Sequence, residues 1–127
     1  MSERHELVDV IGGIWTKDLA ADVLGLTDVD LEDWCRRGDL LGLQTADSDL
    51  VFPAWQFHRP ADGTVQVRNG VVQLVRALTG QPAWSIAVLF VTPTPELDDM
   101  SPIDWIRSGR DAEALTRLGD QIRRERR

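Results

Sequence analysis

The chain has 127 residues, of which 43% are apolar, enough for one compact domain or two small ones sharing a core. A single cysteine, Cys35, excludes an internal disulfide framework, and no apolar stretch approaches the roughly 18 residues of a membrane-spanning helix. The N-terminus is charged and lacks a signal-peptide-like run. We therefore expect a cytoplasmic protein with no membrane association.

Charge divides the chain into two unlike halves. Residues 1–58 carry 12 acidic and 4 basic side chains, a net charge of −8, whereas residues 59–127 carry 9 and 10, a net charge of +1. The overall charge is −7, and the chain ends in a basic run from Arg123 to Arg127. Such asymmetry indicates two surfaces with different partners. We expect two domains, residues 1–62 and 63–127.

The first half predicts two short helices followed by a small hairpin. Thr16 is a typical N-cap for a helix that ends at Gly25, and Thr27 with Asp30 forms a capping-box pattern for a second helix that ends at Gly38. Residues 40–44 and 50–52 have the composition of strands around a turn-rich segment. Helix, turn, helix and wing together predict an acidic winged helix-turn-helix-like unit.

Residues 58–70 are polar and rich in turn formers, and they predict a linker. A helical pattern follows from residue 71 to residue 78, with Gly80 as its expected cap. Residues 82–91 are nearly all apolar, which fits a buried strand or helix; Pro82 near the start favours the helix. Asp111 is positioned to cap a last helix, whose apolar positions are Ala112, Leu115, Leu118 and Ile122.

The stretch from Thr92 to Gly109 contains an acidic loop and then a short, well-capped helix. Ser101 is a good N-cap, Pro102 suits the first helical position, and Asp104 is spaced for an acidic capping box. Gly109 can close the helix in the left-handed conformation. Between them lie three large apolar side chains on a helix too short to be stable alone, namely Ile103, Trp105 and Ile106. The predicted fold is therefore mostly α with a small β-wing, ending in a small helical bundle.

The sequence offers little for catalysis, cofactors or metals. Cys35 lies beside Trp34 on an amphipathic helix with no histidine nearby to act as its base, which predicts a packing thiol. No Cys/His pair has metal-ligand spacing, and no glycine-rich loop resembles a phosphate cradle. His58 falls in the predicted linker. We expect a protein that is not an enzyme and needs no cofactor.

The helix-turn-helix pattern raises the possibility of DNA binding, in which the second helix reads the major groove. The N-terminal residues of that helix, from Asp28 to Asp33, are mostly acidic and would repel phosphates. Only Arg36 and Arg37, at its far end, could contact DNA. The pattern thus disfavours DNA binding, although a helix-turn-helix transcriptional regulator that represses its own promoter, or an adaptor protein, stays an alternative.

The second half resembles the toxin-binding domain of the Xre/MbcA/ParS antitoxin family, whose members partner RES-domain toxins. The likeness covers about residues 68–120, and it is carried by Gly80, Trp84, the segment 87–97 and above all the run Ser101-Pro102-Ile103-Asp104-Trp105-Ile106 with Gly109. The first half resembles excisionase-like winged helix-turn-helix units through residues 19–26, 37–42 and 52–57. The acidic second helix departs from the typical pattern of those units.

The resemblance implies a bacterial type II antitoxin that neutralises a RES-domain, NAD-degrading toxin by direct binding and active-site occlusion. The antitoxin's C-terminal end would lie at the toxin's cleft, and here that end carries Arg117, Asp120, Arg123, Arg124 and Arg127. Arginines pair with carboxylates through forked hydrogen bonds. Trp84 and the Ser101–Gly109 segment would serve as scaffold. The expected complex is a hetero-oligomer, and a homodimer of this chain stays open.

Overall fold

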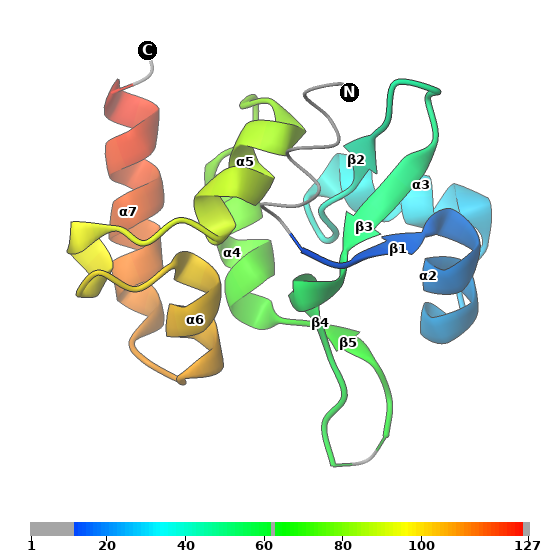
Figure 1. Ribbon diagram of the computed structural model, residues 1–127, viewed down its shortest axis with the longest axis horizontal. Coiled ribbons are helices and arrows are strands. Elements are labelled where there is room, and N and C mark those ends of the chain that lie inside the picture. The colour runs from blue at the N-terminus through cyan, green and yellow to red at the C-terminus, as the bar shows by residue number, and fades with distance from the viewer. Residues whose placement is uncertain (1–11, 62, 126–127) are drawn as a thin grey trace.

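The computed structural model describes residues 12–61 and 63–125, which form a mostly α-helical molecule with a small β component, as predicted (Figure 1). The helix-turn-helix unit and its sheet lie on one side, and four helices lie on the other. In the first half the elements are β1 Ile14–Thr16, α2 Lys17–Leu24, α3 Asp28–Arg37, β2 Leu43–Gln44 and β3 Leu50–Pro53. The strands form an antiparallel sheet in the order β1-β3-β2.

The caps predicted for the two helices of this unit are confirmed. The Thr16 hydroxyl accepts a hydrogen bond from the backbone N–H of Leu19 at 3.2 Å, and α2 ends at Gly25, whose φ is 69°. At α3 both bonds of the capping box between Thr27 and Asp30 are made. Each such cap contributes about 1 kcal/mol of helix stability. Local sequence therefore sets the bounds of both helices.

The segment predicted as a linker, residues 58–70, contains most of a short β-hairpin and bonds to the turn that precedes it. After the 3₁₀ turn Ala54–Gln56, strand β4 (Phe57–His58) pairs antiparallel with β5 (Gln66–Val67). Arg68 then bonds twice to the preceding turn: its backbone N–H donates to the Gln56 carbonyl at 2.8 Å, and its Nε donates to the Trp55 carbonyl at 3.1 Å. Strands of two residues are too short to show the alternation by which strands are predicted.

The second half contains α4 Asn69–Ala77, α5 Ala83–Phe90, a 3₁₀ turn at Pro95–Leu97, α6 Pro102–Arg107 and α7 Ala112–Glu125. Residues 82–91 thus form a helix rather than a strand, and α4 is closed by Leu78 rather than by Gly80. α7 packs along α4, where Gly119 permits close approach: a Cβ there would lie 2.7 Å from the Ala77 Cβ.

The two halves share one apolar core. Leu41, Leu43, Val51 and Trp55 from the first half cluster with buried residues of α4, α5, α6 and α7. The boundary expected between residues 62 and 63 falls inside the β4–β5 hairpin. A smaller cluster lies within the helix-turn-helix unit and comprises Ala20, Leu31, Leu40, Phe52 and Phe57. A shared core of this kind fixes how the surfaces of the two halves are placed relative to each other.

Candidate interaction surfaces

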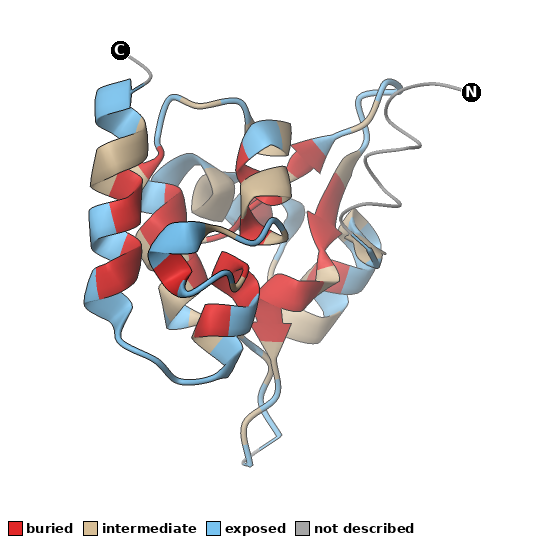
Figure 2. Ribbon diagram, turned by 60° about the vertical axis from the view of Figure 1, so that its left-hand side comes forward, coloured by how far each residue is buried: buried red, intermediate tan, exposed pale blue. Residues whose placement is uncertain are grey.

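The face of α7 that points away from the molecule carries three of the basic residues singled out in the sequence, Arg117, Arg123 and Arg124. One side of α7 is buried through Ala114, Leu115, Leu118 and Gly119, and the opposite side is exposed (Figure 2). The helix begins where the Asp111 carboxylate accepts from the Glu113 backbone N–H at 2.9 Å. Its apolar residues recur every three to four positions, which confines the charged residues to the other face.

The charged side chains on this face pair only weakly among themselves. Arg117 Nη1 lies 3.9 Å from a Glu113 carboxylate oxygen, and Arg123 Nη2 lies 2.5 Å from Asp120 Oδ1. Arg124 is exposed and forms no ion pair within the described part of the chain, and Arg127 lies outside the described residues. Ion pairs along a solvated helix are worth about 0.3–0.5 kcal/mol each, so a partner could recruit these guanidiniums at little cost.

Beside these arginines lies a small apolar groove, which the sequence did not reveal. It has a volume of about 120 Å³ between α5 and the last turns of α7, and its apolar lining is Leu78, Ile86, Leu89 and Ile122. Ser85 and Glu125 stand at its rim, and both are exposed. The sequence feature that could have indicated this groove is the composition of α5, which is apolar around its whole circumference. In the structure, Trp84, Val88 and Leu89 of this helix remain half-exposed. A helix apolar on all sides needs cover on all sides.

The scaffold segment from Ser101 to Gly109 holds α7 in place. Ser101, Pro102, Ile103 and Trp105 are buried, and the Trp105 indole N–H donates to the Asp111 carbonyl at 2.8 Å, directly before α7. Gly109 has a φ of 74° in the turn between the helices. These contacts join α6 to the start of α7 and so determine the direction in which α7 leaves the core.

Three further residues of this predicted scaffold lie as follows. Ile106 is half-buried against Gly70 at the start of α4. A Cβ added to Gly70 would lie only 2.7 Å from the Ile106 Cγ1. The Trp84 indole N–H donates to the Gln44 carbonyl at 2.9 Å and joins α5 to β2. The Asp104 N–H donates to the Ser101 hydroxyl at 3.2 Å, but the Asp104 carboxylate is exposed and lies 3.8 Å from Arg107 instead of closing the expected capping box.

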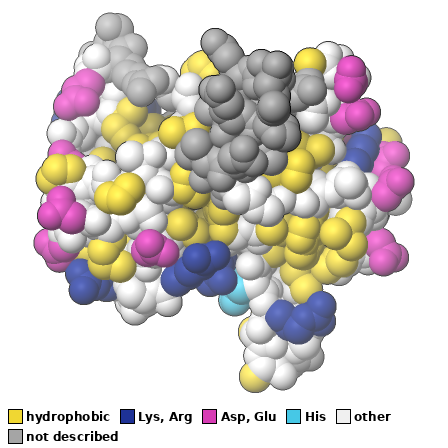
Figure 3. Space-filling model, in the orientation of Figure 1, with side chains coloured by type: hydrophobic (Ala, Val, Ile, Leu, Met, Phe, Trp, Pro, Cys, Tyr) yellow, Lys and Arg dark blue, Asp and Glu magenta, His cyan; other side chains and the backbone are white. Residues whose placement is uncertain are grey.

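The exposed face of the helix-turn-helix unit is acidic. On α3 the carboxylates of Asp28, Glu32 and Asp33 are 66%, 57% and 45% exposed, and Val29 between them is 73% exposed. Asp47 and Asp49 add two exposed carboxylates at the β2–β3 turn. Figure 3 shows acidic side chains along the edge where α2 and this turn lie. The helix and the wing that would face DNA both present negative charge.

The two arginines considered for DNA contact are already engaged. Arg36 Nη1 lies 2.9 Å from Asp33 Oδ1, and Arg37 contacts Asp33 at 3.5 Å and Asp39 at 3.3 Å. Both guanidiniums therefore neutralise carboxylates of their own unit. A duplex would have to displace these pairs and would gain little counterion release.

Cys35 and His58 are the two residues weighed for chemistry in the sequence. Cys35 is half-buried, and burial raises the pKa of its thiol to about 11, which keeps it protonated and unreactive near neutral pH. His58 lies in β4 opposite Gln66. Among the described residues no three His, Cys, Asp or Glu side chains gather as a metal site would require. In the same part of the chain, every helix is too short or too polar to cross a bilayer.

Comparison with known proteins identifies the fold but not a family. No family model and no curated protein matches the chain. Among solved structures, the chain is similar to the NMR structure of Rv2175c, with a TM-score of 0.67 and 21% sequence identity over 86% of this chain and 80% of that one. At this identity the likeness shows a shared fold that extends across both halves.

Proposed function

We propose that this chain is an antitoxin that neutralises a RES-domain toxin by binding it directly. What carries the proposal is the position of the apolar groove between α5 and α7 beside the exposed arginines of α7. Protein-binding surfaces combine a small apolar pocket, which takes an anchor side chain from the partner, with a charged surround. The resemblance of residues 68–120 to the toxin-binding domain supports the same surface.

The mechanism follows from the chemistry of that surface. An apolar side chain of the toxin enters the groove lined by Ile86, Leu89 and Ile122, and the arginines of α7 extend toward the toxin's cleft. A cleft that binds the two ribose rings of NAD uses carboxylates for the hydroxyl groups, and guanidiniums form forked, charge-assisted bonds with such carboxylates. The bound antitoxin then occupies the space that the dinucleotide needs.

Blocking the groove is the most direct test. Ser85 is exposed at the groove rim, so Ser85→Trp fills the groove with an indole ring and disturbs no buried residue. We expect co-expressed toxin to be neither captured in a pull-down nor neutralised in a growth assay. Val29→Trp is the matched control, since it places the same ring on the exposed face of α3. Full rescue of growth by Ser85→Trp would refute the groove as the docking site.

The arginine face needs a separate variant. The triple substitution Arg117→Ala, Arg123→Ala and Arg124→Ala removes exposed charge and leaves the buried side of α7 intact. We expect weaker neutralisation with unchanged thermal stability, and the molar mass of the purified complex gives its stoichiometry. Deleting residues 120–127 is a poorer test because Ile122, which packs against the core, is lost as well. Undiminished rescue by the triple variant would exclude occlusion by this face.

A DNA-binding regulator is the second candidate, and the winged helix-turn-helix topology favours it. The acidic surface of α3 and the wing opposes it, because each carboxylate near a phosphate weakens binding. A gel-shift assay with the chain's own promoter fragment at about 50 mM salt, where electrostatic binding is strong, distinguishes the two candidates. A specific shift there, with or without toxin, would assign DNA binding to this fold.

A further inference from the structure

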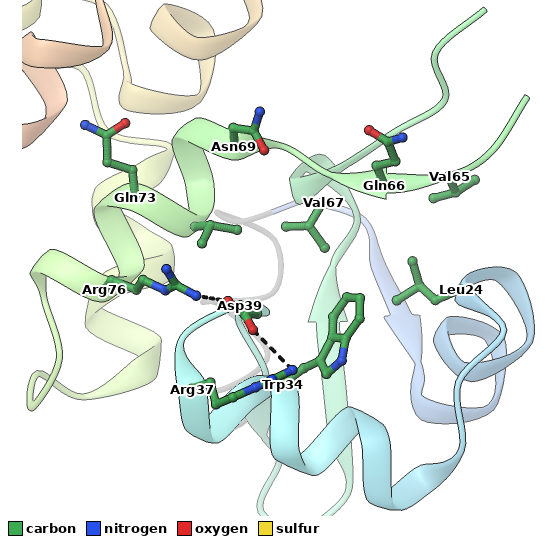
Figure 4. Close-up of a pocket in the computed structure, with 11 residues that line it drawn as sticks. Leu24, Trp34, Arg37, Asp39, Val65, Gln66, Val67, Asn69, Gln73 and Arg76 are labelled. Atoms are coloured by element: carbon green, nitrogen blue, oxygen red, sulfur yellow. Dashed lines mark hydrogen bonds and ion pairs between the residues drawn. The ribbon is translucent and has the colours of Figure 1, made fainter. Parts of the chain in front are cut away.

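A cleft of about 760 Å³ opens at the junction of α3, β5 and α4, away from the surface proposed to bind a toxin (Figure 4). One end of the cleft is apolar and is formed by Leu24, Trp34, Val65 and Val67, all only partly buried. In Figure 4 the Trp34 indole projects into the cleft beside Leu24 and below Val67. An indole with one open side is a natural stacking surface for a flat ring.

The other end of the cleft is charged and rests on three residues. Asp39 accepts from Arg76 through Oδ1, and its Oδ2 lies 3.3 Å from Arg37 Nη2. Arg37 also contacts Asp33, whereas among the described residues the Arg76 guanidinium pairs with Asp39 alone. A guanidinium has five N–H donors, so Arg76, which is 57% exposed, keeps donors for another acceptor.

Arg76 is held in place before any ligand arrives. Its aliphatic stem lies on Gly38, where a Cβ would come within 2.9 Å of the Arg76 Cγ. The Gly38 backbone closes α3 with a φ of 82°, so a larger residue would meet both strain and a clash. A cation positioned by packing on one side and by Asp39 on the other loses little entropy on binding an anion.

Polar residues also border the cleft. Gln66 and Asn69 line it, but in Figure 4 their side-chain amides, which form no hydrogen bond within the described residues, point away from Trp34 and Arg76. Gln73 differs, since its amide nitrogen is bound to the Ala112 carbonyl and the Thr116 hydroxyl on α7. The cleft therefore offers a stacking surface and a cation to a ligand. Its volume lies within the roughly 300–1,000 Å³ of small-molecule sites.

We propose that this cleft binds a small planar aromatic monocarboxylate. The ring stacks on Trp34 among Leu24 and Val67, and the carboxylate takes a forked pair of hydrogen bonds from Arg76. Charge disfavours a phosphate as the ligand. The Asp39 carboxylate already binds the Arg76 guanidinium, and it repels a dianion more strongly than a monoanion. Such a ligand touches α3 in one half and α4 in the other, and it therefore stabilises the junction between them.

The test is a titration of the full chain with indole-3-acetate, followed by calorimetry and by NMR of the Trp34 indole N–H. We expect binding with a Kd below about 1 mM, and binding at least about tenfold weaker for neutral indole-3-acetamide, which lacks the charge. Equal binding of the amide would overturn the anion anchor. Tighter binding of adenosine monophosphate would assign a nucleotide site instead, and no shift of Trp34 would refute the site.

Two variants at the charged end make the test specific. Arg76→Gln should weaken binding about tenfold, whereas Arg59→Gln, an exposed arginine in the β4–β5 loop, should leave it unchanged. Asp39→Asn should tighten binding, because the guanidinium is released and the competing carboxylate is gone. A misfolded variant cannot mimic that gain, and weaker binding by Asp39→Asn in a chain of normal melting temperature would overturn the proposal. The inference does not depend on toxin binding.

Discussion

The two halves of the molecule share one core but expose opposite chemistry. α3 turns carboxylates and Val29 to solvent, while α5 and α7 turn apolar side chains and guanidiniums outward. The buried residues and caps of α2 and α3 suffice to build a helix-turn-helix, and none of them determines what its outer face binds. The contrast teaches that topology and surface charge vary independently, so a helix-turn-helix can carry an acidic outer face.

The largest expected effects concern the two apolar clusters. Leu31 and Leu115 are 0% and 1% exposed and lie in the two apolar clusters, so each substitution by alanine should cost about 2–5 kcal/mol of unfolding free energy. Because Val67 packs against both clusters, both variants should lower the midpoint of one common transition in urea, followed by circular dichroism and Trp fluorescence. Arg117→Ala is the surface control. Two separate transitions would show that the halves fold independently.

The next largest effect should be a loss of stability at alkaline pH, which acts through Cys35 at the smaller cluster. Burial raises the pKa of the Cys35 thiol from 9.0 to about 11. The unfolded thiol therefore ionises first, so stability is complete below pH 9 and declines as pH rises toward 11, by roughly 2 kcal/mol. The chain has no tyrosine and one lysine, Lys17, which keeps other alkaline titrations few. Unfolding free energies at several pH values measure the decline.

Cys35→Ala serves as the control for that pH dependence. Without the thiol, the unfolding free energy should vary less between pH 8 and pH 10.5, because the titrating group has been removed. These two pH values cover most of the roughly two-unit range between the thiol pKa of the unfolded chain and that of the folded chain. The same burial predicts slow reaction of native Cys35 with alkylating reagents at pH 8. If wild type and Cys35→Ala lose stability in parallel, the thiol is not the group responsible.

Much of the fold could be predicted because its signals are local. Caps at Thr16, Thr27 and Ser101, together with apolar periodicity, located the helices within two residues. The β4–β5 hairpin could not be predicted because its two-residue strands are too short to show alternation. The apolar groove and the cleft could not be predicted because each depends on segments that are distant in sequence. The close approach at Gly119 is of this kind: it shows only when α4 lies beside α7.

Removing one helix cap in each half should lower the unfolding free energy by about 1 kcal/mol, and one of the two losses should be the larger. Thr27→Ala removes the capping box of α3, but water can reach the exposed N–H groups that remain. Ser101 is 5% exposed, so Ser101→Ala leaves the Asp104 N–H with less access to water and should cost more, nearer about 2 kcal/mol. Thermal denaturation of both variants gives the order. A costlier Thr27→Ala would place the stronger cap in the first half.

Neutralising the acidic face should barely change stability and yet change what the surface attracts. Asp28→Asn, Glu32→Gln and Asp33→Asn together remove three exposed carboxylates from α3 and leave Asp30, which the capping box needs. Surface changes of this kind alter unfolding free energy by about 0.5 kcal/mol or less. They also release Lys17 and Arg36 from their ion pairs and leave Arg37 paired with Asp39 alone.

We therefore expect this triple variant to shift a duplex of arbitrary sequence at about 50 mM salt and to release it at about 200 mM, as non-specific electrostatic binding requires. The unmodified chain should not shift the same duplex. That pair of results would show that repulsion by the carboxylates, and not the geometry of α3, excludes DNA. Binding by the unmodified chain would instead mean that the basic second half attracts DNA strongly enough to outweigh the acidic first half.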